Sequence, residues 1–236
     1  MLQARLFGEL AVRIGDRDVP PIPGMRPRAL LAYLLLTPGL HPRARVAGRF
    51  WPDVLDTSAR ASLRSALWTI RAALDAAGGG EYLHADRASV GIAPGLPRTV
   101  DAEEFARLLA AGDPASLERA VALADAPLLA DLADEWALDA QDAHRERLVA
   151  TIERLGQAAE DAGDLAAAVT WSRAAIERDR LRESAHRDLM RRLASSGERA
   201  QALTAYRRLR SALAAELGVA PSPETRRLAE TLRQGE

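Results

Sequence analysis

The second half of this chain repeats itself at a fixed spacing. Gly163 and Gly197 lie 34 residues apart, and each is followed by an acidic residue. The same offset pairs Ala168 with Ala202, Val169 with Leu203, Thr170 with Thr204 and Arg173 with Arg207. Glycine commonly follows the last residue of a helix. Each 34-residue unit is therefore predicted to form a pair of helices joined by turns. One pair cannot bury its apolar face alone, so the spacing predicts stacked helical hairpins with a concave binding surface.

The sequence shows no convincing strand pattern after residue 98. Turn signals such as Asp113-Pro114 separate stretches that have helical periodicity. We expect helices at residues 101–111, 114–125, 136–162, 164–178, 182–196, 198–217 and 222–234. A helix-turn-helix unit of 34 residues is the tetratricopeptide spacing, so residues 99–236 are predicted to form an all-α, tetratricopeptide-like domain.

The first half has a different organisation, with alternating apolar residues at its start. We expect strands within residues 3–14, a turn at 15–18, a return strand from Val19, helices from Arg26, at 43–50 and at 57–76, and a β-hairpin at 81–92. Strands, three helices and a hairpin, in this order, are typical of a winged helix. The fold class is therefore mainly α with a small β component, a winged helix at residues 1–98 followed by the helical domain at 99–236.

The third predicted helix has two unlike faces. Asp56, Thr57 and Ser58 are favourable N-cap residues, so the helix is expected to begin here. Its apolar residues form one narrow stripe, made of Leu63, Leu67, Ile70 and Leu74. The remaining surface carries small residues, hydroxyls and arginines, which suits the DNA major groove, because arginine binds guanine and small side chains allow close approach. The predicted DNA contacts on this helix are Arg60, Ala61, Arg64, Ser65, Trp68, Thr69 and Arg71.

Further DNA contacts are expected from the elements beside this helix. In a winged helix the second helix and the wing lie near the recognition helix, so Arg43, Arg45 and Arg87 are predicted to reach backbone phosphates. All three arginines could instead be ordinary surface charges. Trp68 also has an alternative, because its ring could pack partly against the second helix rather than touch DNA.

The charge distribution supports a polyanionic partner for the first half. The formal net charge of the whole chain is −1, but its charges are unevenly distributed. Positions 1–98 contain 13 arginines and 8 acidic residues, whereas positions 99–236 contain 19 arginines and 25 acidic residues. The net positive charge of positions 1–98 is consistent with nucleic-acid binding, and the net negative charge of positions 99–236 is not. The sequence has many arginines and no lysine, so arginine content alone carries little weight.

Residue types that are absent exclude several kinds of site. The chain has no cysteine, which rules out disulfides, thiolate metal sites and a cysteine nucleophile. It has no lysine for a phosphate-binding loop, and its four histidines are scattered. We therefore expect no enzyme activity, no cofactor and no metal. Because the sequence also shows no secretion signal or membrane-spanning run, we expect a cytoplasmic, nucleoid-associated protein without a membrane partner.

Several segments resemble one family of regulators. In the first half these are RALLAYLLL at 28–36, FWPD at 50–53 and ARASLRSALWTIR at 59–71. These segments are similar to the DNA-binding domain of the antibiotic regulatory protein (SARP) activators. In the second half, LLADLADEW at 128–136, ESAHRDLM at 183–190 and ELGVAPSPET at 216–225 resemble their bacterial transcriptional activator domain.

The resemblance implies an OmpR-like winged helix followed by a tetratricopeptide-type domain. It also implies binding to repeated sites in double-stranded promoter DNA, often as a homodimer, and recruitment of the RNA polymerase holoenzyme to biosynthetic gene clusters. We therefore predict that the protein is a sequence-specific DNA-binding transcriptional activator. Two alternatives remain: a helical-repeat interaction or sensor module whose winged domain does not bind DNA, and a repressor on the same fold.

Overall fold

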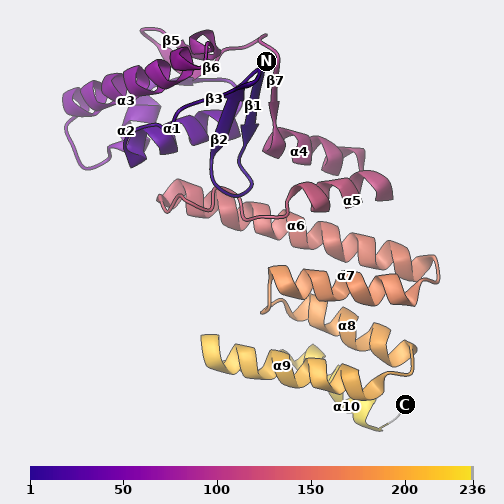
Figure 1. Ribbon diagram of the computed structural model, residues 1–236. Coiled ribbons are helices and arrows are strands. Elements are labelled where there is room, and N and C mark those ends of the chain that lie inside the picture. The colour runs from indigo at the N-terminus through magenta and orange to yellow at the C-terminus, as the bar shows by residue number, and fades with distance from the viewer. Residues whose placement is uncertain (235–236) are drawn as a thin grey trace. The chain divides into compact units, whose positions relative to one another are not determined.

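The computed structural model describes residues 1–234 of the chain (Figure 1). Its contacts divide into two compact units, residues 1–110 with 122–142, and residues 111–121 with 143 onward. The chain is mainly α-helical with two small sheets, which confirms the expected fold class. Within the described residues, no helix combines the length and the apolar character needed to cross a membrane.

The first unit contains a four-stranded sheet with the order β3-β2-β1-β7. Strands β1 (Leu2–Arg5) and β2 (Ala11–Ile14) pair antiparallel. Strand β3 (Arg17–Asp18) begins inside the predicted turn and ends just before Val19, where the return strand was expected. Strand β7 (Arg98–Val100) pairs in parallel with β1 and is missing from the sequence prediction, because three residues are too few to show an alternating pattern.

Three helices and a second sheet complete the winged helix (Figure 1). The helices are α1 (Met25–Leu36), α2 (Arg43–Phe50) and α3 (Asp56–Ala76). The second sheet has the order β4-β6-β5 and consists of β4 (Leu40–Pro42), β5 (Leu83–Ala85), which follows the short 3-10 turn η1 (Gly80–Tyr82), and β6 (Ser89–Ile92). The β5–β6 hairpin is the predicted wing. Strand β4 was not predicted; it lies in the short segment between the first two predicted helices.

Aromatic packing joins residues beyond position 98 to the winged helix. Trp136 lies edge-on to Tyr33 of α1, with ring centroids 5.4 Å apart, and 5.9 Å from the ring of Phe50 of α2. Ion pairs join Arg26 to Asp134 and Arg28 to Asp131. The units therefore differ from the expected ranges 1–98 and 99–236, since the segment carrying Trp136 completes the core of the first unit.

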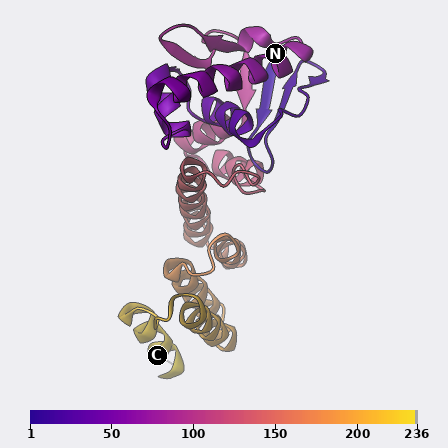
Figure 2. The same ribbon diagram turned by 90° about the vertical axis from the view of Figure 1, so that its left-hand side faces the viewer.

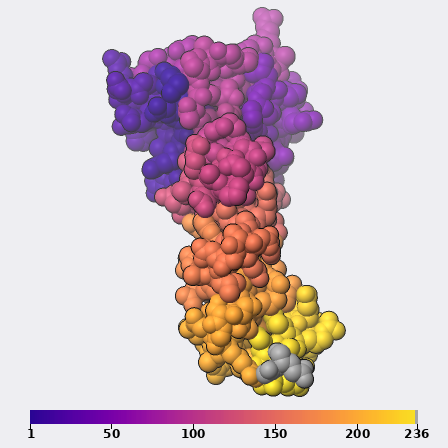
Figure 3. Space-filling view, turned by 90° about the vertical axis from the view of Figure 1, so that its right-hand side faces the viewer, coloured from indigo at the N-terminus to yellow at the C-terminus, as the bar shows by residue number. Residues whose placement is uncertain are grey.

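The helices after the first sheet lie within two residues of their predicted bounds. They are α4 (Asp101–Ala111), α5 (Pro114–Leu123), α6 (Glu135–Asp161), α7 (Leu165–Arg178), α8 (Glu183–Ser195), α9 (Arg199–Leu217) and α10 (Pro223–Gln234). Figure 3 shows α7 to α10 in orange and yellow. These four helices form the two clear repeats.

The equivalent positions of the 34-residue repeat have equivalent structures. Gly163 and Gly197 have φ values of 80° and 78°, a left-handed conformation that glycine adopts readily after a helix. Ala168 of α7 and Ala202 of α9 are both fully buried. Helix α8 packs against both α7 and α9. The stacked helical hairpins predicted from the spacing are therefore present.

Candidate nucleic-acid interface

Helix α3 is held in place by the apolar stripe predicted from its sequence. Leu63, Ile70 and Leu74 are fully buried, and Leu67 is nearly so. The helix packs against α1 and α2 (Figures 1 and 2). Its N-cap is Leu55, and no side chain caps the helix, so the cap expected from Asp56 to Ser58 does not form. The Asp56 carboxylate instead occupies the first turn, where a negative charge is favourable.

The opposite face of α3 is exposed. Arg60, Ala61, Arg64 and Ser65 are accessible, and Thr69 is half-buried, with its hydroxyl donating to the Ser65 carbonyl. Trp68 is 73% exposed, so any partial contact of its ring with α2 leaves most of the side chain accessible. The face of α3 opposite its apolar stripe is therefore accessible to a partner.

The turn of the wing is ordered by one carboxylate. The Asp86 side chain accepts hydrogen bonds from the backbone N–H groups of Ala88 at 2.8 Å and Ser89 at 2.6 Å. These bonds, from Ser89 first and Ala88 second, lower the pKa of Asp86 to about 2. Asp86 therefore stays ionised at neutral pH and fixes the turn that carries the exposed Arg87.

Arg43, at the start of α2, links this turn to the helices. Its backbone N–H donates to the Ala88 carbonyl at 2.9 Å, and its guanidinium donates to the Asp86 carbonyl at 3.1 Å. Neither acceptor is a carboxylate, so the positive charge of Arg43 is not neutralised by an ion pair.

Four predicted arginines meet around one concavity. A groove of about 670 Å³ lies between α2, the first turns of α3 and the wing turn, and Arg43, Arg60, Arg64 and Arg87 line it. Asp86 is the acidic residue of this lining. In the part of the chain that the structure describes, none of the four arginines forms a salt bridge. The four arginines outnumber the single Asp86 carboxylate, so the groove carries an excess of positive charge that can attract a polyanion.

Two other predicted arginines lie outside this groove. Arg45 is exposed on α2 but does not line the groove. Arg71 is half-buried, and its guanidinium donates to the carbonyls of Gly80 at 3.0 Å and Leu83 at 2.7 Å. Arg71 thus ties α3 to η1 and β5. These acceptors could not be predicted from the residues of the helix, since they reach Arg71 only when the chain folds back after it.

Within residues 1–234, no cluster of three or more histidine or acidic side chains is arranged to hold a metal ion. His41 bonds to the carbonyl of Thr37, and His84 to Asp86 and Ser89, so both have local partners.

The helical half matches a known protein family. The model of the bacterial transcriptional activator domain matches residues 100–233. The chain belongs to this family. It is a transcriptional regulator of the SARP type, as the sequence resemblance predicted. No curated protein sequence matches the regulator.

A solved structure resembles the regulator over its full length. This structure is EmbR of Mycobacterium tuberculosis in complex with a low-affinity phosphopeptide, with a TM-score of 0.73 and 26% sequence identity. The match covers 100% of the regulator and 65% of the EmbR chain. The likeness supports the arrangement of an N-terminal winged domain followed by a helical domain.

Proposed function

We propose that the regulator is a sequence-specific DNA-binding transcriptional activator that reads the major groove with helix α3. The observation that carries this proposal is the groove lined by Arg43, Arg60, Arg64 and Arg87, whose charges have no carboxylate partners within residues 1–234. DNA supplies phosphates for such charges and guanine edges for a guanidinium fork.

The positions of these residues suggest different tasks. Arg60 and Arg64 project from the exposed face of α3, one turn apart, with the small residues Ala61 and Ser65 beside them. This face can approach base edges closely, so Arg64 is assigned to base recognition. Arg43 and Arg87 flank the groove from α2 and the wing, and we assign them to phosphates.

The proposed partners follow from the family. Membership of the bacterial transcriptional activator family supports promoter DNA and the RNA polymerase holoenzyme as partners. We further propose that the regulator binds promoter repeats as a homodimer, activates a biosynthetic gene cluster, and acts in the cytoplasm at the nucleoid.

The experiment has two stages. Selection from random double-stranded DNA identifies the preferred site, and fluorescence anisotropy then measures affinity for that site across a salt titration. Arg64→Ala should weaken binding by about 1–3 kcal/mol and relax the preference at one base pair. Arg43→Ala should weaken binding to all sequences alike and reduce the dependence on salt.

The matched control is Arg210→Ala, which removes an exposed arginine from α9 in the second unit. Its DNA affinity should equal that of the wild type. Equal binding by Arg64→Ala and wild type at every salt concentration would contradict the assignment of α3. Absence of DNA binding even at low salt would favour an interaction module, and run-off transcription with purified polymerase distinguishes activation from repression.

A further inference from the structure

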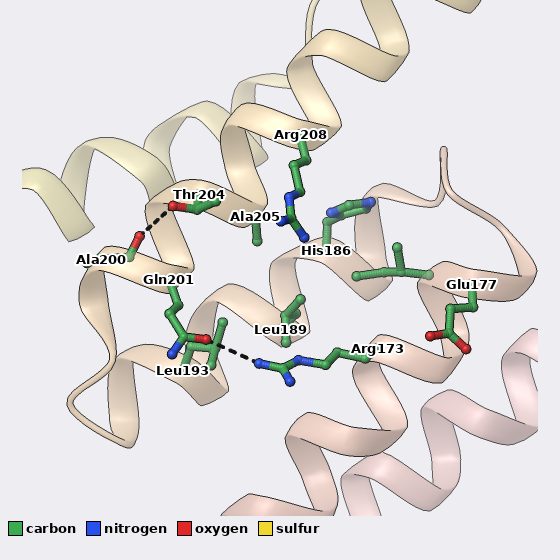
Figure 4. A pocket seen from close by; sticks show the side chains of 11 residues that line it. Arg173, Glu177, His186, Leu189, Leu193, Ala200, Gln201, Thr204, Ala205 and Arg208 are labelled. Carbon is green, nitrogen blue, oxygen red and sulfur yellow. Dashed lines mark hydrogen bonds between the residues drawn. The ribbon is translucent and has the colours of Figure 1, made fainter.

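The second unit contains a pocket that the proposed DNA binding does not use. It has a volume of about 590 Å³ and lies between helices α7, α8 and α9 (Figure 4). This volume is in the range of pockets that hold small molecules. All residues that line it belong to the second unit, so the pocket is described within one compact body.

The pocket has an apolar floor. Ile176 of α7, Leu189 and Leu193 of α8, and Ala205 of α9 line it, and Leu193 and Leu189 are almost completely buried. An apolar surface of this kind favours a ligand with a hydrocarbon or aromatic body, because burial removes that body from water.

Two arginines stand at the walls. Arg173 projects from α7 and Arg208 from α9, on different sides of the pocket in Figure 4. The guanidinium of Arg173 donates to the side-chain oxygen of Gln201 at 3.2 Å, which leaves its charge unneutralised. Among the described residues, neither arginine forms a salt bridge. Two such guanidinium groups are suited to a carboxylate.

His186 adds a buried polar group to the same lining. It is 4% exposed, and its Nε2 lies 3.1 Å from the Arg180 carbonyl, so this nitrogen donates. Nδ1 has no hydrogen-bond partner among the described residues. Burial lowers the pKa of His186, which keeps the ring neutral and leaves Nδ1 as an acceptor. Buried polar atoms without partners are uncommon, and they point to a missing donor.

We propose that this pocket binds a small organic carboxylate with an apolar body, whose carboxylate lies between Arg173 and Arg208. Glu177 lines the same pocket and repels a carboxylate, so the charged end of the ligand should lie away from it. A ligand hydroxyl or amide N–H would satisfy Nδ1 of His186. This site goes beyond the proposed DNA binding and does not depend on it.

The test uses the full chain without DNA and the fluorescent probe 8-anilinonaphthalene-1-sulfonate, which carries a negative charge on an aromatic body. We expect saturable binding at one site, displacement by decanoate, and little displacement by decyltrimethylammonium. The double variant Arg173→Gln/Arg208→Gln should bind the probe about tenfold more weakly. Arg210→Gln, which changes an exposed arginine of α9 outside the pocket, should bind like the wild type.

Circular dichroism of each variant confirms that the helices are retained, which we expect because both pocket arginines are exposed. The proposal is overturned if the double variant binds the probe as tightly as the wild type does, or if the cationic competitor displaces the probe as well as decanoate. Displacement by an acidic hexapeptide at lower concentration than decanoate would assign the pocket to a peptide and also overturn it.

Discussion

Arg60 and Arg71 lie on the same helix, yet their guanidinium groups have different surroundings. Arg60 lines the basic groove, and Arg71 bonds to two backbone carbonyls. Arg71→Ala should lower the free energy of unfolding by about 1–3 kcal/mol, because two charge-assisted hydrogen bonds are lost. Arg60→Ala should leave stability within about 0.5 kcal/mol of the wild type and weaken DNA binding.

Urea denaturation and DNA anisotropy on the two variants measure these effects separately. A loss of stability in Arg60→Ala, or an unchanged unfolding curve for Arg71→Ala, would contradict the roles given to them.

The periodicity of residues 57–76 was sufficient to predict the two faces of α3, because the spacing of buried side chains depends only on helix geometry. Leu63, Ile70 and Leu74 are buried as expected, and Arg64 is exposed. The acceptors of Arg71 could not be predicted, since they belong to a turn and a strand that fold back beside the helix. Residue identity shows the charge and size of a side chain, but tertiary packing decides which arginine is hydrogen-bonded within the fold and which is available to a partner.

The wing turn allows two effects of one residue to be separated. The Asp86 carboxylate opposes DNA by its charge and orders the turn by accepting two backbone hydrogen bonds. Asp86→Asn removes the charge but keeps a side-chain oxygen that can accept those bonds, so its DNA affinity should rise. Asp86→Ala removes both, so it should bind DNA several-fold more weakly than Asp86→Asn.

Anisotropy at two salt concentrations compares the Asp86 variants. If both bind DNA equally, the turn does not help to position Arg87, and only the charge matters.

Two helical glycines are expected to respond oppositely to the same substitution. A Cβ atom on Gly156 of α6 would lie 2.5 Å from Nη1 of Arg192, which is 1% exposed and bonded to Glu160 and Ser172. Gly156→Ala should therefore destabilise the second unit by about 1–3 kcal/mol. Gly48 of α2 has open space around it, so Gly48→Ala should stabilise the first unit by about 0.5–1 kcal/mol.

Thermal unfolding monitored by circular dichroism measures both glycine variants, each against the wild type. A higher unfolding temperature for both variants would show that helix propensity, rather than the contact with Arg192, decides the outcome.

At the scale of the whole molecule, the sequence predicted the bounds of the helices better than the division of the chain into compact units. Helix bounds follow from local periodicity and turn residues, and they agree closely with the structure. The grouping depends on contacts between distant residues, such as those of Trp136 with Tyr33 and of β7 with β1. The basic groove could be predicted in part. A winged-helix topology was enough to predict that α2, α3 and the wing converge, but it did not predict which arginines would line the groove.

Stability of the whole chain should depend on pH through a buried histidine. His144 of α6 is 8% exposed, and burial, followed by the charges of Arg147 and Arg178, lowers its pKa to about 4. In the unfolded chain its pKa is about 6.5. Between these values the unfolded chain binds a proton that the folded chain does not, so the free energy of unfolding falls as the pH falls. The loss should reach up to about 3 kcal/mol near pH 4.

His144→Gln provides the comparison, because glutamine does not titrate. Urea denaturation at intervals between pH 7 and pH 5 should give a shallower decline for this variant than for the wild type. Burial also lowers the pKa of His186, so some decline should remain, and His144→Gln/His186→Gln should be flatter still. Carboxylates with lowered pKa values, such as Asp86, lose their contribution only at more acidic pH and do not affect this range. Parallel curves for the wild type and His144→Gln would show that His144 is protonated in the folded chain as readily as in the unfolded one.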